Sequence, residues 1–186
     1  MTDETAVREH VPGEVPPLVP GRACGGCTLC CKVLAIEELQ KPLGTWCAHC
    51  AAGKGCRIYE RRPQECRDYY CAWLTWPEAS EAWRPSRAKI VLDFDRSGQA
   101  LRAHVDPGRP GAWKAEPYYS QLKRWASQPG EGQRLVIVMI DDRAIVVLPD
   151  RDIDLGRIGP GETIATEQRR TPGGAMIVHA YKTKSV

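Results

Sequence analysis

Cysteine is absent from most of this 186-residue chain, because all nine cysteines lie between Cys24 and Cys71. Phenylalanine occurs once, and no apolar run approaches the roughly 18–20 residues that a membrane-spanning helix requires. The first ten residues are acidic and polar and contain no apolar stretch of the kind found in a secretory signal. These absences predict a cytoplasmic protein that has no membrane partner and works in a reducing compartment.

Strong charge of one sign is lacking as well. Lysine and arginine number 26 against 23 aspartates and glutamates, which gives a formal net charge of +3. Such a mild balance argues against nucleic acid or an anionic membrane as the partner. The chain is 42% hydrophobic but contains 17 glycines and 15 prolines, so we expect a globular protein with many loops.

Composition divides the chain into four stretches. Residues 1–22 are rich in proline and polar residues and predict a disordered, partly extended tail. Residues 23–76 contain every cysteine and predict a metal-binding module. Residues 77–87 read as a connector to residues 88–186, which contain no cysteine and predict a separate domain that folds without metal.

The cysteine spacing indicates metal chemistry. The order is Cys24-x-x-Cys27-x-x-Cys30-Cys31, then Cys47-x-x-Cys50, Cys56, Cys66 and Cys71. An odd number of clustered cysteines in a reducing compartment favours metal ligands over disulfides. Each Cys-x-x-Cys loop brings two sulfurs to one metal. The even spacing of the first three matches the ferredoxin way of holding three corners of an iron–sulfur cube, whereas zinc sites more often use separated pairs, so zinc and iron both remain open.

Two short helices are expected within the module. The apolar pattern of residues 28–40 predicts the first, which Pro42 and Gly44 would end. The second is predicted over residues 63–70, where a proline at the start does no harm. We expect an irregular loop between them, holding Cys47, His49, Cys50 and Cys56.

These helices constrain which thiols can meet. A first helix that begins near Cys27 would put Cys27, Cys30 and Cys31 on one side of its first turn. Cys30 and Cys31 do not easily point at one metal, so one of them would serve a second site. Cys66 and Cys71 are five residues apart, and a shared metal would need the second helix to end between them. The eight or nine thiols thus allow one site or two.

Other residues of the module have two readings each. His49 is either a ligand or a loop residue beside the metal. The arginines near Cys56 and Cys66 either form a solvated surface or donate N–H groups to sulfur; they are Arg57, Arg61, Arg62 and Arg67. The tryptophans of the module are expected to form its apolar packing; they are Trp46, Trp73 and Trp76.

Residues 88–186 have the pattern of a small α+β domain. Strand-like runs occupy residues 89–95, 100–105, 135–140, 144–148 and 175–181. Turn signals lie at residues 96–98 and 141–142, and residues 116–127 predict a helix. The run 135–140 is apolar on both alternating sides, which predicts a central strand. The expected fold class of the chain is therefore α+β, with a small irregular helical cysteine-rich module followed by a β-rich α+β domain.

The cysteine pattern resembles a known family. The matching segments are Cys24-x-x-Cys27-x-x-Cys30-Cys31, Trp46-Cys47-Ala48-His49, Gly55-Cys56-Arg57-Ile58-Tyr59, Arg62-Pro63-Gln64-Glu65-Cys66-Arg67-Asp68-Tyr69 and Cys71-Ala72-Trp73-Leu74. Together they resemble the bacterial CxxCxxCC cysteine-cluster family, described only as zinc- or iron-chelating domain proteins, over about residues 24–74.

The resemblance implies a ligand set and a metal. The family's eight cysteines fall on Cys24, Cys27, Cys30, Cys31, Cys47, Cys56, Cys66 and Cys71, and Cys50 is extra. The implied cofactor is zinc or iron, with a 4Fe–4S cluster as one form of the iron. A flagellin lysine methylase carries a similar cluster, but the resemblance itself supplies no activity.

Three functions follow as hypotheses. The first is a metal-binding protein. The second is a methyltransferase-like enzyme, which the sequence disfavours because no glycine-rich loop follows Val91-Leu92-Asp93. The third is a zinc-stabilised module that binds a protein or nucleic acid. No catalytic constellation stands out, since Asp93 with Asp95 and Asp141 with Asp142 read as strand-end and turn residues. Residues 88–186 are then expected to cover the module or to bind a partner protein.

Overall fold

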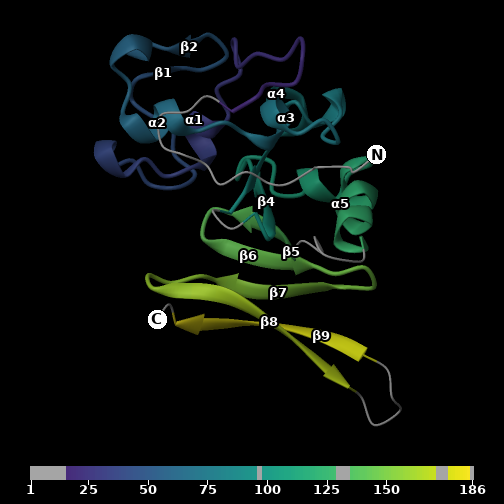
Figure 1. The fold of residues 1–186 in the computed structure, drawn as a ribbon. Coiled ribbons are helices and arrows are strands. Elements are labelled where there is room, and N and C mark those ends of the chain that lie inside the picture. Colours follow the sequence, from purple (N-terminus) through teal and green to yellow (C-terminus); the bar gives the residue numbers. More distant parts are fainter. Residues whose placement is uncertain (1–15, 96–97, 129–134, 171–175, 185–186) are drawn as a thin grey trace.

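The computed structural model describes residues 16–95, 98–128, 135–170 and 176–184, and it has the expected α+β fold. A helical, cysteine-rich region lies at one end of the molecule, a mixed sheet in the middle and a long hairpin at the other end (Figure 1). Within these ranges, no helix is both long and apolar enough to cross a membrane.

The central sheet has the order β3-β4-β5-β6-β7. Its strands are β3 (Ile90–Phe94), β4 (Ala100–Val105), β5 (Leu135–Ile140), β6 (Arg143–Val147) and β7 (Asp152–Arg157). Only β4 and β5 pair in parallel; the other neighbours are antiparallel. The central place predicted for residues 135–140 is confirmed, because an apolar run on both faces suits a strand covered on both sides.

Most strand predictions for residues 88–148 are confirmed to within one residue. The β5–β6 turn is at Asp141 and Asp142, as expected, with Asp141 at φ 53°. The other predicted turn falls partly on residues 96–97, which lie outside the described residues. Residues 176–181 of the predicted run 175–181 belong to β9 (Met176–Lys184), and residue 175 lies outside the described residues. Strand β9 pairs with β8 (Glu162–Arg170) in a separate two-stranded hairpin. Strands β7 and β8 were missed, because their polar composition hides the alternation.

A helical crossover joins the two parallel strands, as parallel pairing requires. It contains the 3₁₀ turn η4 (Ala112–Lys114) and helix α5 (Tyr118–Ala126), which confirms the helix predicted over residues 116–127. Leu122, Trp125 and Ala126 are buried on its inner face. The Tyr119 hydroxyl donates to Asp152 at 3.0 Å, so α5 is fastened to β7.

The cysteine region consists of very short elements. They are α1 (Cys30–Val33), η1 (Glu37–Leu39), β1 (Cys50–Ala51), β2 (Gly55–Cys56), η2 (Tyr59–Arg61), α2 (Gln64–Asp68) and α3 (Ala72–Thr75). The helix predicted over residues 28–40 is wrong beyond its first turn. Ile36 and Lys41 instead exchange two backbone hydrogen bonds of 2.9 Å, and this bridge replaces the helix.

Two other predictions for this region have different outcomes. The helix predicted over residues 63–70 is present as α2, which follows Pro63 and ends at Asp68, before Cys71. The loop between the predicted helices is not wholly irregular, because β1 and β2 form a small hairpin with Cys50 opposite Cys56. This pairing places Cys50 and Cys56 on neighbouring strands, which their spacing in the sequence did not predict.

One apolar core spans the predicted boundary between the module and the domain. Leu29, Val33, Trp73 and Leu74 belong to the same buried cluster as the inner residues of the sheet. The predicted connector joins it too, since η3 (Glu81–Trp83) and α4 (Pro85–Ala88) place Trp83 at 2% exposure. Independent folding of residues 88–186 stays a prediction, but the shared core gives the two parts a common source of stability.

The three tryptophans of the module differ in burial, and only part of the predicted tail is described. Trp73 is buried and Trp76 packs on Phe94 and Trp125, as expected, but Trp46 is 46% exposed and does not belong to the core. Trp46 instead lies beside the Lys32 ammonium, 5.6 Å from its ring centroid. Residues 1–15 of the predicted tail lie outside the described residues. Val19, which is described, donates its N–H to the Leu74 carbonyl at 2.8 Å.

A buried ion pair links β3 to β4. Asp93 is 7% exposed, and its Oδ1 accepts a 2.8 Å hydrogen bond from Arg102 Nε and lies 3.2 Å from His104 Nε2. Burial alone would raise the pKa of Asp93, but His104 and Arg102 hold it below the ordinary carboxyl value of 3.8. The ion pair therefore stabilises the fold above that pH, and the stabilisation is lost as the pH falls through the lower folded-state pKa.

Asp93→Asn should lower the free energy of unfolding by about 2 kcal/mol at neutral pH, because hydrogen bonds to a charged group lose their charge. The deficit should shrink in acid, where the wild type also loses the charge. Urea unfolding at neutral and acidic pH measures both. Asp150→Asn, which alters an exposed ion pair with Arg151, is the matched control and should change little at either pH. A deficit equal at both pH values would contradict the assignment.

Candidate metal centre

All nine cysteines are free thiols within the described residues. Cys24 is exposed, Cys47 and Cys71 are buried, and the other six are half-buried. Cys24 and Cys27 precede α1, Cys30 and Cys31 open it, and Cys71 immediately precedes α3. The cysteine region thus offers sulfur donors from its first turn to its last helix, with no disulfide to occupy them.

Close backbone packing joins the first cysteine loop to the β1–β2 turn. The Cys27 N–H donates to the Cys24 carbonyl at 3.0 Å and closes the loop. The Thr28 hydroxyl accepts the Gly53 N–H at 3.0 Å. A Cβ on Gly26 would lie 2.9 Å from the Gly53 carbonyl oxygen, so only glycine fits there. Gly26 therefore allows the first Cys-x-x-Cys loop to pack against the turn between β1 and β2.

Further backbone contacts gather the middle cysteines. The Cys47 N–H donates to the Cys31 carbonyl at 2.9 Å, and the Cys50 N–H donates to the Cys47 carbonyl at 2.9 Å. Cys50 stands opposite Cys56 in the small hairpin. Four cysteines that span residues 31–56 are thereby held in one neighbourhood by main-chain hydrogen bonds.

Electrostatic interactions group Cys71 with Cys24 and Cys27. Burial raises the pKa of Cys71 to about 11, and the neighbouring Cys27 and Cys24 add to the increase. Burial, with Cys27 next, also raises the pKa of Cys24. Cys71 lies in the shared core, and Cys27 and Cys30 pack against it. We call Cys24, Cys27, Cys30 and Cys71 the first thiol set.

Cys66 belongs to a different neighbourhood. Burial raises its pKa to about 11, Glu65 adds to this, and Cys31, Cys47 and Cys56 follow. Since α2 ends at Asp68, between Cys66 and Cys71, the two thiols approach different partners. We call Cys31, Cys47, Cys56 and Cys66 the second thiol set.

Cys30 and Cys31 form the junction between the sets. A hydrogen bond with Cys30 has the largest effect on the pKa of Cys31. Together with a second hydrogen bond, from Cys50, it outweighs the effect of burial and lowers this pKa to about 6. The same Cys30–Cys31 hydrogen bond, followed by burial, raises the pKa of Cys30. Cys31 is therefore the thiolate of this group at neutral pH, and Cys30 and Cys50 are thiols that donate S–H to it. Cys50 stays protonated because burial, then the Cys31 charge, raises its pKa to about 11.

A buried lysine lies beside the thiols. Lys41 is 8% exposed, and its Nζ donates to the Lys32 carbonyl at 2.7 Å and to the Leu34 carbonyl. Burial lowers the pKa of Lys41, which Cys47, Cys31 and Cys30 oppose. Its ammonium partly balances the charge of the Cys31 thiolate and helps to lower the pKa of Cys31. Sequence reasoning missed this role, because nothing in a lysine placed before Pro42 indicates burial.

Among the described contacts, no arginine N–H group donates to a sulfur, but the Arg62 charge acts to lower the pKa of Cys24. Arg67 donates to the Arg62 carbonyl at 3.0 Å and to the Glu60 carbonyl at 3.1 Å. Arg62 stacks 4.0 Å above the Tyr59 ring centroid. Backbone amides do interact with the Cys71 sulfur, because the N–H groups of Leu74 and Trp73 act to lower the Cys71 pKa.

The thiols are grouped without converging on a point. Among the described residues, which include every cysteine, no three His, Cys, Asp or Glu side chains already form a metal-holding arrangement. His49 is half-buried, and its carbonyl accepts the Arg57 N–H at 2.9 Å. The two predicted roles of the His49 imidazole, as a metal ligand or as a loop residue beside the metal, stay predictions.

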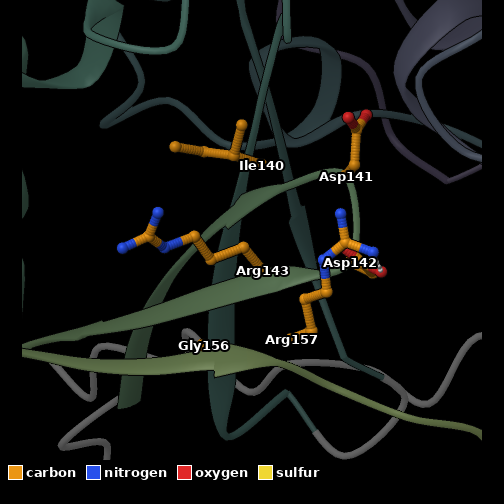
Figure 2. A pocket seen from close by; sticks show the side chains of 6 residues that line it. All are labelled: Ile140, Asp141, Asp142, Arg143, Gly156 and Arg157. Carbon is orange, nitrogen blue, oxygen red and sulfur yellow. Dashed lines mark ion pairs between the residues drawn. The ribbon is translucent and has the colours of Figure 1, made fainter.

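A pocket on the sheet lies apart from the thiol sets. It is lined by Ile140, Asp141, Asp142, Arg143, Gly156 and Arg157 (Figure 2). Arg143 forms an ion pair with Asp154, and Arg157 Nη1 lies 3.6 Å from Asp142 Oδ2, so both arginines of the pocket face carboxylates of the protein. The pocket contains no thiol and offers no cavity for the cysteine chemistry.

Comparisons with protein-family models, with curated proteins and with solved structures find no match for this chain. The resemblance to the CxxCxxCC cysteine-cluster family therefore rests on the quoted motifs alone.

Proposed function

We propose that this protein binds zinc or iron through its eight family-type cysteines, divided between the two thiol sets. The observation that carries the proposal is the crowding of nine free thiols. Burial and neighbouring thiols together raise the pKa of five of them, which are Cys24, Cys30, Cys50, Cys66 and Cys71. Thiols packed this closely resist losing their protons, because each thiolate repels the next. A metal cation removes that repulsion, takes the place of the protons and holds the sulfurs together.

The donor sets fit two kinds of metal. The first thiol set has three evenly spaced cysteines and a remote fourth, Cys71, which is the ferredoxin manner of holding an iron–sulfur cluster. The second thiol set draws one cysteine each from α1, β2 and α2 and one, Cys47, from the chain before β1. A set of four thiolates suits zinc. Zinc would stabilise the fold, whereas an iron–sulfur cluster would add electron transfer. Lys41 would offset part of the negative charge in either case.

Metal analysis of the full chain tests the proposal directly. The protein is purified anaerobically and in air, and bound zinc, iron and acid-labile sulfide are measured against protein concentration. A brown protein with broad visible absorption and sulfide indicates an iron–sulfur cluster, and a colourless one with stoichiometric zinc indicates zinc. A folded protein that holds neither metal, even after anaerobic reconstitution, would refute the function.

Cys50→Ser should leave metal content nearly unchanged. Cys50 is the cysteine that the family pattern lacks, and here it is a protonated donor to Cys31. Serine keeps a hydrogen-bond donor at that place, so Cys31 retains much of its stabilisation. Metal content and the free energy of unfolding, measured beside the wild type, check this. Metal loss in the variant would make Cys50 a ligand.

A second candidate is binding of a partner protein through residues 88–186. The β8–β9 hairpin favours it, because the hairpin extends from the end of the molecule opposite the cysteine region (Figure 1). Its strands pair only with each other among the described strands, and Tyr181 is 42% exposed. The test compares the binding of a partner protein to the full chain with its binding to a chain that ends at Gly159. The shorter chain lacks the hairpin and keeps every cysteine.

A further inference from the structure

The two thiol sets use eight cysteines and leave Cys50 outside both. Cys50 lies in β1 directly opposite Cys56, a member of the second thiol set, in β2. Both are free thiols with half-buried side chains, whereas Cys47, the nearest cysteine to Cys50 in the sequence, is buried. The β1–β2 hairpin lies at the outer end of the cysteine region, away from the central sheet (Figure 1). Small molecules in the solvent can therefore reach the pair.

The kind of strand pair decides whether two opposed cysteines can be joined. Opposed residues of antiparallel strands alternate between hydrogen-bonded and non-hydrogen-bonded pairs, and side chains approach more closely in the second kind. The Arg57 N–H donates to the His49 carbonyl at 2.9 Å. This bond joins the neighbouring pair, so Cys50 and Cys56 form a non-hydrogen-bonded pair. Such pairs have Cα atoms about 4.5 Å apart, within the range of roughly 4.4–6.8 Å that a disulfide requires.

The hairpin is fixed in this register at its tip. The Lys54 N–H donates to the Ala51 carbonyl at 2.8 Å and closes the turn, in which Gly53 has φ 73°, a conformation that favours glycine. The Gly53 N–H donates to the Thr28 hydroxyl at 3.0 Å, which ties the turn to the first cysteine loop. A slip by one residue would turn one sulfur to the opposite face of the hairpin. The fixed turn therefore keeps both sulfurs on the same face.

We propose that Cys50 and Cys56 are a redox site, which low-molecular-weight disulfides such as oxidised glutathione convert into a cross-strand disulfide. The Cys56 thiolate attacks one sulfur of the small disulfide and expels the other half as a thiolate. Cys50 then gives its proton to solvent and displaces the second small thiolate from the Cys56 sulfur. The two protein thiols thus lose two electrons and two protons, and the small disulfide becomes two small thiols.

Oxidation at this site removes one ligand from the second thiol set. The sulfur of Cys56 cannot bind a metal as a thiolate while it is bonded to Cys50, so the metal of that set is released. This consequence rests on the proposed metal-binding function, whereas formation of the disulfide does not. An excess of small thiols reverses the exchange and restores Cys56 as a ligand. Cys50 thereby acts on the metal without binding it.

Peptide mapping of the full chain tests the redox site. The metal-free and metal-loaded proteins are equilibrated at increasing ratios of oxidised to reduced glutathione, and the remaining thiols are blocked before digestion with trypsin. Cleavage after Lys54 and Arg57 places Cys56 alone in peptide 55–57, whereas Cys50 falls in peptide 33–54 together with Cys47. Fragmentation of the linked peptides identifies the joined cysteines, and metal content is measured on the same samples.

The wild type should give peptide 55–57 linked through Cys56 to Cys50. The metal-free protein should form this link at a lower oxidant ratio than the loaded protein, because bound metal protects Cys56. The loaded protein should lose the second-set metal as the link forms and keep the first-set metal. Cys50→Ser should form no link to peptide 55–57 and should retain its metal at the ratio that empties the wild type. Cys24→Ser, which removes an exposed thiol outside the hairpin, is the matched control and should form the link as the wild type does.

Three outcomes would overturn parts of this assignment. Absence of the link at every oxidant ratio, or a link from Cys50 to Cys31 or Cys47 instead, would exclude the redox site. A link that forms while all metal is retained would contradict the release of metal through Cys56. A wild type that binds no metal would refute the proposed function, and mapping of the metal-free protein would still decide whether Cys50 and Cys56 form the disulfide.

Discussion

Cys66→Ser is expected to release the metal of the second thiol set and to leave the first set loaded. Burial, then Glu65, then Cys31, Cys47 and Cys56 raise the Cys66 pKa, so its sulfur lies among those of the second set. Serine binds zinc or iron far more weakly than a thiolate does. Because structural zinc contributes roughly 10–16 kcal/mol of apparent folding energy in small peptides, losing one ligand of four should cost several kcal/mol.

Cys27→Ser is the mirror experiment for the first thiol set. It should release the metal held with Cys71 and spare the metal held with Cys66. Metal per chain, measured for each variant and for Cys50→Ser as the matched control, separates the sets. Retention of all metal in both variants would contradict the assignment of these cysteines as metal ligands. Loss of all metal in either would replace two sites with one shared site.

The sequence predicted the strands of the central sheet better than the helices of the cysteine region. Residues 135–140 are apolar on both faces, and such a run has few alternatives to a central strand. The helix expected over residues 28–40 had a correct apolar pattern but only one turn of helix. The pattern could not show that Ile36 would bond to Lys41, because that bridge is decided by how Lys41 is buried.

The candidate site was likewise predictable from the sequence only where local spacing decides it, and not where tertiary packing does. Spacing and family resemblance named the eight cysteines, and the end of α2 between Cys66 and Cys71 was foreseen as a geometric condition. The grouping of Cys71 with Cys24 and Cys27 could not be foreseen, since it depends on the shared core. The buried Lys41 ammonium was equally hidden, because a buried polar group is defined by what surrounds it.

Removing the metal should loosen the cysteine region and the neighbouring half of the core together. Leu29, Val33 and Trp73 share the buried cluster with the sheet, so loss of the thiol sets would withdraw support from α1 and α3. Strands β5 and β6 should stay ordered, because α5 covers them and the Tyr119 hydroxyl holds α5 to Asp152 at 3.0 Å. We therefore expect a metal-free protein that keeps its sheet and loses fixed packing around Trp73.

Acid should produce the same change as a chelator. Metal binds thiolates and displaces protons, so its affinity falls as the pH falls, by about tenfold per pH unit for each ligand that is protonated in the metal-free state. With the pKa values of Cys66 and Cys71 raised to about 11, those ligands compete with protons over the whole neutral range. Cys31, with a pKa of about 6, joins them only in mild acid. The affinity should therefore fall more steeply below about pH 6 than above it.

Near-ultraviolet circular dichroism and hydrogen exchange, followed during chelation at neutral pH and during acidification, measure both effects. Amides of α1, α2 and α3 should exchange quickly once metal is lost, and those of β5 and β6 should remain protected. Metal restored at neutral pH should restore the protection, which separates metal loss from irreversible damage. If stoichiometric metal is removed without any change in protection, the thiol sets bind metal for a purpose other than holding the fold together.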